Sequence, residues 1–230
     1  MPSASRIAHT GLAFAHPMSE TAVQAAIEAL PLPAEPLILD TGCGNGEVLV
    51  RALRARPGAR GLGVDLDADA ITEARDRAAG LPARFEVRDA STVTGPCDAV
   101  INIAASHAHG GFPAALAVLG RLGPVVLYGE GFWQRPPSDA FLAALGGATV
   151  DELADLEGLH AATAHAGFEI VRTFVAGEED WAHYEETLAA NAERHHAPDT
   201  EAYARRIRDR RALPGGTDIL GFALLVLRAR

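Results

Sequence analysis

Lysine is absent from this chain of 230 residues, and all 20 of its basic residues are arginine. This absence excludes every mechanism that needs a lysine amine. A P-loop phosphate site, a Schiff base with pyridoxal phosphate and the Tyr-x-x-x-Lys pair of many dehydrogenases all require that amine. The function therefore has to be sought in acidic, glycine and histidine motifs.

Cysteine is also scarce, and the chain has no long apolar run. Cys43 and Cys97 have neither metal-site spacing nor the pattern of a disulfide framework. His195 and His196 are adjacent and would point to different sides of a helix, so we expect no metal site there. No stretch has the length and apolarity of a membrane span or a signal peptide, so we expect a cytoplasmic protein without a membrane partner.

The charge balance is acidic, with 30 acidic against 20 basic residues and a formal net charge of −10. Such a balance disfavours a broad nucleic-acid surface. Five arginines lie between Arg205 and Arg211, but Glu201 and Asp209 are interleaved with them. We therefore expect a solvated helix face there and no nucleic-acid partner. The length fits a single domain, which would act as a monomer or a homodimer.

The stretch from Pro36 to Val50, PLILDTGCGNGEVLV, organises the rest of the chain. Its first apolar residues read as a short buried strand, and an apolar pattern with helical spacing begins at Glu47. Between them lie Asp40 and then glycines at alternate positions, Gly42, Gly44 and Gly46. A strand, a tight glycine turn and a helix predict the first half of a nucleotide-binding βαβ unit.

The glycine spacing indicates which ligand this unit binds. The third glycine of a dinucleotide fingerprint would fall at position 47, where Glu47 would repel a pyrophosphate. The pattern actually present, an acidic residue followed by G-x-G-x-G, resembles motif I of the class I S-adenosylmethionine-dependent methyltransferases. That cofactor carries a sulfonium and an ammonium but no phosphate. The resemblance implies a cofactor loop formed by Asp40, Gly42, Cys43, Gly44 and Gly46.

Two further predicted strands, at 61–66 and 84–88, are also followed or ended by aspartate. Asp65 stands about twenty residues beyond the loop, where a carboxylate binds ribose hydroxyls. Its alternative role is to cap the next helix, for which Asp67 is better placed. The resemblance implies that Asp89 accepts a hydrogen bond from the adenine amino group. The resemblance also implies cofactor contacts from four further residues, which are Leu66, Ala90, Asn102 and Ile103.

The loop after the predicted strand 98–103 is the first place to look for a catalytic group. Many methyltransferases that act on planar amino groups carry Asn/Asp-Pro-Pro-aromatic there. Here Asn102 is followed by Ile-Ala-Ala, which argues against adenine, cytosine or glutamine amides as acceptors. An oxygen acceptor needs a general base, and His107 and Glu130 are the candidates. Alternatively, His107 only hydrogen-bonds its own loop, and a sulfur or carbon acceptor needs no base.

Six side chains are candidates for an acceptor pocket. Aromatic rings supply apolar walls and can face an onium cation. For each of the six the alternative is a purely structural packing role. The six candidates are His16, Met18, Phe132, Trp133, Trp181 and Tyr184.

The resemblance extends over nearly the whole chain. Stretches such as HPMSE, from His16 to Glu20, and GEGFWQRPP, from Gly129 to Pro137, resemble a poorly characterised group of bacterial small-molecule methyltransferases. The implied fold is α/β, a Rossmann-like doubly wound sheet of seven strands in the order 3-2-1-4-5-7-6 with strand 7 antiparallel. A helical cap is expected between strands 6 and 7.

We expect one methyltransferase domain over residues 1–230. Its parts would be an N-terminal segment and helix (1–33), a cofactor-binding core (34–176), a helical cap (177–216) and a last strand (217–230). In the first part, residues 1–17 would be irregular and Ser19 would be the N-cap of the helix. In the core, the fifth strand would run from Pro124 to Gly129. The predicted function is methyl transfer from S-adenosylmethionine to a small-molecule acceptor, with S-adenosylhomocysteine as product. The alternatives are a regulatory S-adenosylmethionine-binding protein, an enzyme that uses the sulfonium otherwise, and an NAD-dependent oxidoreductase.

Overall fold

The computed structural model describes residues 3–230, so the first two residues of the predicted N-terminal segment lie outside it. The chain divides into two compact units. The sheet unit comprises residues 19–130, 157–175 and 223–230. The helical unit comprises residues 131–156 and 176–222 together with the segment that ends at Met18.

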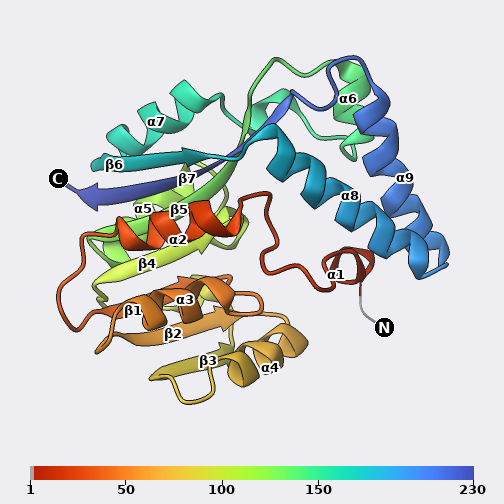
Figure 1. Ribbon diagram of the computed structural model, residues 1–230. Coiled ribbons are helices and arrows are strands. Elements are labelled where there is room, and N and C mark those ends of the chain that lie inside the picture. The colour runs from red at the N-terminus through yellow and green to blue at the C-terminus, as the bar shows by residue number, and fades with distance from the viewer. Residues whose placement is uncertain (1–2) are drawn as a thin grey trace. The chain divides into compact units, whose positions relative to one another are not determined.

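The sheet unit is built on seven strands in the order β3-β2-β1-β4-β5-β7-β6, as predicted (Figure 1). The first five strands along the chain run parallel, and β7 is antiparallel to β6. The final residues of β5 and the first residues of β7 belong to the helical unit. The strands are β1 (Leu37–Thr41), β2 (Arg60–Asp65), β3 (Ala83–Val87), β4 (Ala99–Ile103), β5 (Val125–Trp133), β6 (Phe168–Val175) and β7 (Leu220–Ala229).

The helices of this unit cover the sheet and explain its apolar strands. In Figure 1, α2 and α3 lie in front of the sheet and α5 lies behind it. Because both faces are covered, a central strand such as β4 is apolar along nearly its whole length and buried. The helices are α2 (Glu20–Glu28), α3 (Glu47–Ala55), α4 (Ala68–Arg77), α5 (Ala114–Leu122) and α7 (Leu156–His165), with short 3₁₀ turns η1 (Ala90–Thr92) and η2 (Ser106–His109).

The helix starts follow the capping residues of the sequence. The Ser19 hydroxyl accepts a hydrogen bond from the Ala22 N–H at 3.3 Å, which confirms Ser19 as the N-cap of α2. Asp67 caps α4 by accepting from the N–H groups of Asp69 and Ala70 at 2.9 and 3.1 Å. A cap of this kind satisfies N–H groups that have no partner within the helix. Asp65 is therefore not needed as the cap.

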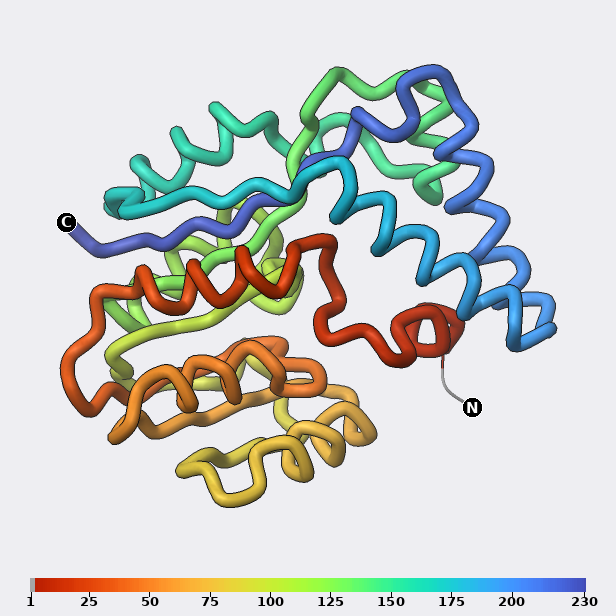
Figure 2. Tube along the Cα trace, in the orientation of Figure 1, coloured from red at the N-terminus to blue at the C-terminus, as the bar shows by residue number. Residues whose placement is uncertain are grey.

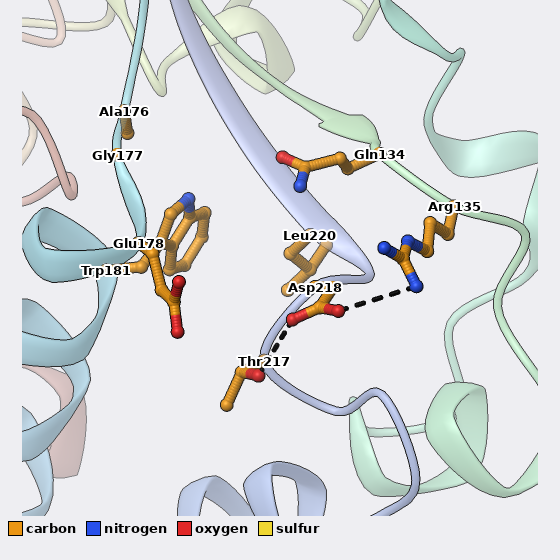
Figure 3. Close-up of a pocket in the computed structure, with 9 residues that line it drawn as sticks. All are labelled: Gln134, Arg135, Ala176, Gly177, Glu178, Trp181, Thr217, Asp218 and Leu220. Atoms are coloured by element: carbon orange, nitrogen blue, oxygen red, sulfur yellow. Dashed lines mark hydrogen bonds and ion pairs between the residues drawn. The ribbon is translucent and has the colours of Figure 1, made fainter.

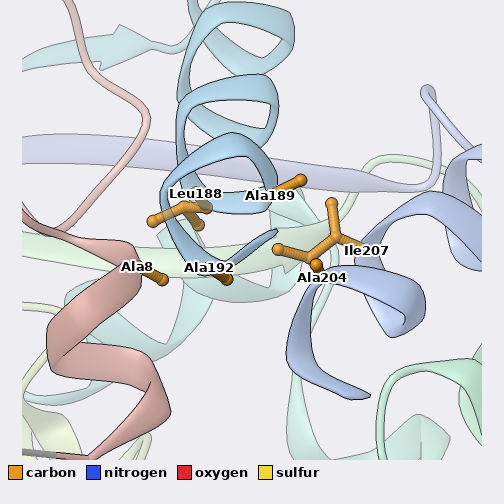
Figure 4. Close-up of a cluster of buried hydrophobic side chains, with 6 residues drawn as sticks. All are labelled: Ala8, Leu188, Ala189, Ala192, Ala204 and Ile207. Carbon is orange, nitrogen blue, oxygen red and sulfur yellow. The ribbon is translucent and has the colours of Figure 1, made fainter. Parts of the chain in front are cut away.

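The helical unit is held together by small apolar side chains. Figure 4 shows Ala8 from α1 beside Leu188, Ala189 and Ala192 from α8, and Ala204 and Ile207 from α9. Alanines at these positions allow helices to approach closely. The two long helices, α8 and α9, run antiparallel to one another along the traced chain (Figure 2). The helices are α1 (Ala4–Ala8), α6 (Asp139–Ala144), α8 (Glu178–Arg194) and α9 (Pro198–Ala212), with the 3₁₀ turn η3 (Val150–Glu152).

Ion pairs join α8 to α9. Arg208 pairs with Glu186 and Glu193, and the buried Glu185 pairs with both Arg210 and Arg211. The arginine-rich stretch of α9 thus binds acidic side chains of the neighbouring helix. This pairing goes beyond the solvated face that the sequence predicted.

Two expectations about secondary structure were wrong. Residues 3–17 were expected to be irregular, but they include the helix α1, which Ser3 caps. The Asn191 side chain donates a hydrogen bond to the carbonyl of Ala8, the last residue of this helix, at 2.8 Å. The residues after Gly129 were expected to leave the sheet, but β5 continues to Trp133. The Trp133 N–H donates to the Ala154 carbonyl at 2.8 Å, so the extended backbone keeps a partner.

Candidate cofactor and active site

The glycine loop between β1 and α3 is fastened to the neighbouring strand. The N–H groups of Gly42 and Cys43 both donate to the Val64 carbonyl of β2, at 2.9 and 3.0 Å. Gly42 has φ +77°, and a Cβ atom there would lie 2.5 Å from the Cβ of Ala105. Gly44 also has positive φ, +50°, but a Cβ atom there would meet nothing within 4 Å. One glycine therefore allows close packing and the other leaves open space beside the loop.

Asp65 lies at the end of β2 directly against this loop. Its Oδ2 accepts a hydrogen bond from the Gly44 N–H at 2.8 Å, and its Oδ1 accepts from the Asp67 N–H at 2.9 Å. A carboxylate oxygen has two lone pairs, so each retains one for another donor. Leu66, the next residue, is 72% exposed. The structure thus brings the predicted ribose-binding carboxylate to the predicted cofactor loop.

Asp40 is the buried carboxyl of the site. Burial raises the pKa of Asp40 to about 8, and the neighbouring charge of Asp65 adds to the effect. Without a cation beside it, this carboxyl therefore keeps its proton near neutral pH. Burial also raises the pKa of the Cys43 thiol, as do Asp40 and Asp65, so Cys43 is not an activated nucleophile.

Asn102 joins the end of β4 to the end of β1. Its Nδ2 donates to the backbone carbonyl and the hydroxyl of Thr41, at 3.2 and 3.0 Å, and to the Ala105 carbonyl at 3.3 Å. Its Oδ1 is buried and has no partner among residues 3–230. Ala104 has φ +55°, an unusual value for a residue with a Cβ atom. The chain therefore turns sharply beyond Ile103, and one buried acceptor stays unsatisfied beside the glycine loop.

Asp89 and Ala90 lie just beyond β3. The Asp89 carboxylate accepts a hydrogen bond from the Ser91 N–H at 2.8 Å and so caps η1. Hydrogen bonding with Ser91 holds the pKa of Asp89 below its usual value, so the carboxyl is ionised at neutral pH. Asp89 is exposed, and Ala90 is buried.

The two predicted base candidates are in different surroundings. His107 lies in η2 with its side chain exposed. Glu130 is buried on β5, where its Oε2 accepts a hydrogen bond from the Tyr128 hydroxyl at 2.7 Å. Burial and the charge of Glu130 raise the pKa of Tyr128, while a hydrogen bond with Ser106 opposes that rise. Glu130 is thus part of a buried network that reaches η2.

Glu47 does not act as the sequence suggested. It was expected to repel a pyrophosphate, but its carboxylate pairs with Arg51, at 2.7 Å, and with Arg77. Burial would raise the pKa of Glu47, but the hydrogen bonds from these two arginines outweigh it and lower the pKa. Two guanidinium groups neutralise this charge, so repulsion by Glu47 no longer argues against a dinucleotide.

Four of the candidate acceptor-binding residues are buried in the helical unit. The His16 ring stacks between Phe14 and Phe222, with centroid distances of 5.0 and 5.4 Å. Burial lowers the pKa of His16 to about 4, so the ring is neutral. Met18, two residues after His16, is also buried. The Trp133 indole N–H donates to the Val150 carbonyl at 2.7 Å. The Phe132 ring packs so tightly on Gly221 that a Cβ atom there would lie 2.2 Å away.

The other two candidates, Trp181 and Tyr184, lie on α8. The Tyr184 hydroxyl forms a hydrogen bond with the His9 ring at 2.8 Å, and the rings of Trp181 and Tyr184 meet edge to face. Trp181 lines a pocket of about 390 Å³ within the helical unit (Figure 3). Opposite the indole, Asp218 forms an ion pair with Arg135 at 3.5 Å. Trp181 is thus the one candidate among the six that lines this pocket.

The sequence did not indicate His109 as a candidate site residue, although it lies in the same 3₁₀ turn as His107. His109 ends η2 and is only 8% exposed, and neither ring nitrogen has a hydrogen-bond partner among residues 3–230. The sequence pattern does not distinguish it from His107, because burial in a short loop leaves no periodic signal. Within the same range, no three His, Cys, Asp or Glu side chains gather as a metal site, and no helix is long and apolar enough to cross a membrane.

Comparison with known sequences identifies the core of the sheet unit. Residues 38–123 match the family model of a methyltransferase domain. The uncharacterized protein YjhP of Escherichia coli K12 is 30% identical over 158 residues. This match covers 64% of the present chain and 63% of YjhP, so it spans less than two thirds of that relative.

Comparison with solved structures extends the likeness to the whole fold. The X-ray structure of E. coli YjhP has a TM-score of 0.89 at 24% identity, over 100% of both chains. A methyltransferase from Thiobacillus denitrificans, solved in complex with S-adenosylhomocysteine, has a TM-score of 0.84 at 25% identity, over 100% of this chain and 99% of that one. Residues 38–123 are therefore a methyltransferase domain, and the chain has the fold of the S-adenosylmethionine-dependent methyltransferases, whose cofactor is S-adenosylmethionine.

Proposed function

We propose that this protein transfers a methyl group from S-adenosylmethionine to a small-molecule acceptor. The observation that carries the proposal is the contact between Asp65 and Gly44. It places a carboxylate with spare lone pairs against a glycine loop that has open space beside it. That arrangement suits a ribose diol next to a backbone that a ligand can approach closely.

The other residues of the sheet unit complete the proposed cofactor site. The ammonium or sulfonium would lie near the buried carboxyl of Asp40 and the unsatisfied Oδ1 of Asn102, both of which favour a cation. Asp89 would accept from the adenine amino group, and the Ala90 N–H would face the ring. Further contacts come from Gly42, Cys43, Gly46, Leu66 and Ile103.

The reaction asks little of the protein beyond positioning. Bound S-adenosylmethionine supplies an electrophilic methyl carbon. A lone pair of the acceptor forms the new bond to that carbon, the carbon–sulfur bond breaks, and its electron pair stays on sulfur as S-adenosylhomocysteine leaves. Holding the acceptor in line with the departing sulfur, away from water, accounts for most of the acceleration.

An oxygen acceptor also has to lose a proton. Glu130 is one proposed base, because the hydrogen bond from the Tyr128 hydroxyl fixes the position of its carboxylate. His107 is the other, on the loop that follows β4. Six side chains of the helical unit are proposed to bind the acceptor, and the pocket wall formed by Trp181 supports this role for that residue. They are His16, Met18, Phe132, Trp133, Trp181 and Tyr184.

Calorimetric titration with S-adenosylhomocysteine tests the cofactor half of the proposal, with NAD as the control. We expect micromolar binding of the first alone. Binding of NAD in its place would refute the proposal.

The alternative is a regulatory S-adenosylmethionine-binding protein, which would form no methylated product. An assay for that product therefore tests it. His107→Ala or Glu130→Gln should leave cofactor binding unchanged and reduce turnover if the protein is an enzyme with a general base.

A further inference from the structure

The hydrogen-bonding state of the His109 side chain is unusual for a buried polar group. A neutral imidazole carries one N–H donor and one acceptor nitrogen. Both nitrogens of His109 are buried, yet neither has a partner in the described chain. Buried polar atoms in folded proteins are nearly always paired, and leaving one unpaired destabilises the protein. An imidazole kept in this condition indicates a partner that is not part of the chain.

The surroundings of His109 narrow the choice of partner. η2, which His109 ends, packs against η1, which Asp89 caps. Burial lowers the pKa of His109, Asp89 raises it and His107 lowers it, with a net lowering. The ring is therefore neutral at physiological pH and offers an N–H donor close to a carboxylate that accepts hydrogen bonds only.

Adenine fits this pair of groups. Its amino group donates hydrogen bonds, and its ring nitrogens accept them. A carboxylate can bind the amino group but cannot bind a ring nitrogen, which needs an N–H donor. Asp89 and His109 together supply one group of each kind.

We propose that His109 is a specificity-determining residue of the cofactor site, whose N–H donates to a ring nitrogen of the adenine. This inference rests on the proposed cofactor site and adds to it a residue that neither motif I nor the strand-end aspartates indicate. His109 binds the adenine and takes no part in the transfer of the methyl group.

The first test replaces the imidazole by a ring without nitrogen. His109→Phe should weaken binding of S-adenosylhomocysteine about tenfold, the loss expected for one hydrogen bond to a buried group. The melting temperature of the ligand-free variant should equal or exceed that of the wild type, because an unsatisfied polar group has been removed. A lower melting temperature with unchanged affinity would assign His109 a packing role and overturn the inference. His107→Phe, at the exposed neighbour on the same turn, is the matched control and should leave the affinity unchanged.

The second test identifies the atom contacted. The 1-deaza, 3-deaza and 7-deaza analogues of S-adenosylhomocysteine each replace one ring nitrogen by C–H. For one of them, the loss of affinity in the wild type should exceed the loss in His109→Phe by about tenfold. Equal losses in both proteins for all three analogues would overturn the inference and leave the proposed function intact. No binding of S-adenosylhomocysteine to the wild type would overturn both.

Discussion

The edge of the sheet around the glycine loop and the interface between α8 and α9 both bury polar side chains, but they treat them differently. Between the two helices, the buried carboxylate of Glu185 has two cations, Arg210 and Arg211. At the sheet edge, Asp40 is equally buried, and its neighbouring charge is another carboxylate, Asp65. His109 lies at the same edge with neither nitrogen paired.

We propose that this difference distinguishes side chains that stabilise the fold from side chains that bind the cofactor. A buried charge that is fully paired within the chain contributes to a defined structure and has nothing left to bind. A buried group without a partner raises the free energy of the empty protein, and a ligand that supplies the partner recovers that energy. Removing single groups on each side should therefore change different measured quantities.

Glu185→Gln should give the largest effect, on stability alone. Removing one member of a buried ion pair leaves two guanidinium groups without a counter-charge, and we expect a loss of about 3 kcal/mol in the free energy of unfolding. Urea denaturation measures it. Glu186→Gln, at an exposed pair with Arg208, is the matched control, for which we expect at most about 0.5 kcal/mol. The affinity for S-adenosylhomocysteine should not change in either variant. A loss of affinity in Glu185→Gln would contradict the distinction between stabilising and ligand-binding groups.

Asp65→Asn should produce the reverse pattern. We expect the affinity for S-adenosylhomocysteine to fall about 100-fold, since two hydrogen bonds to a charged acceptor are weakened. Asp67→Ala removes the N-cap of α4 two residues away, so it should cost about 1 kcal/mol of stability and leave the affinity within about twofold. Calorimetric titration and urea denaturation of both variants separate the two roles. Equal affinities of wild type and Asp65→Asn would contradict the proposed site.

Asp40 should make binding depend on pH. Its pKa in the empty protein is about 8, so the carboxyl is mostly protonated at pH 7. A bound cation favours the carboxylate, so binding of S-adenosylmethionine should release a proton. Below pH 8, the affinity should therefore increase by up to about tenfold for each unit by which the pH increases. Calorimetry in buffers of different ionisation enthalpy counts the released proton. Asp40→Asn should abolish the release, and an unchanged value would mean that another group titrates.

The same group has a calculable effect on stability. A carboxyl whose pKa is raised on folding binds more protons in the native state than in the unfolded state between about pH 4 and pH 8. The stability of the ligand-free protein should therefore fall as pH rises through this window. Asp40→Asn should flatten the profile of urea midpoints against pH over the same range.

Much of the fold could be predicted because the relevant signals are local. Short apolar runs, capping residues and alternate glycines predicted β1, α3 and the N-caps Ser19 and Asp67, and the resemblance to the methyltransferases supplied the strand order. The extension of β5 to Trp133 and the helix α1 could not be predicted. Both depend on hydrogen bonds to residues distant in the sequence, such as Ala154 and Asn191.

The candidate site was predictable only in part, for the same reason. Acidic residues at strand ends are visible in a sequence, whereas burial of a loop side chain is not. His107 and His109 look alike in the sequence, yet one is exposed and the other is buried without partners. Glu47 shows the opposite error, because a charge assumed to face a ligand is neutralised by Arg51 and Arg77.

The place of β7 in the sheet has a consequence for biosynthesis. Its residues leave the ribosome after those of β5 and β6, yet β7 lies between these two strands. Until residues 223–229 are available, both neighbours present unpaired strand edges, which readily join other chains. A shortened protein that ends before Ala223 should accumulate in aggregates even though its glycine loop and aspartates are complete.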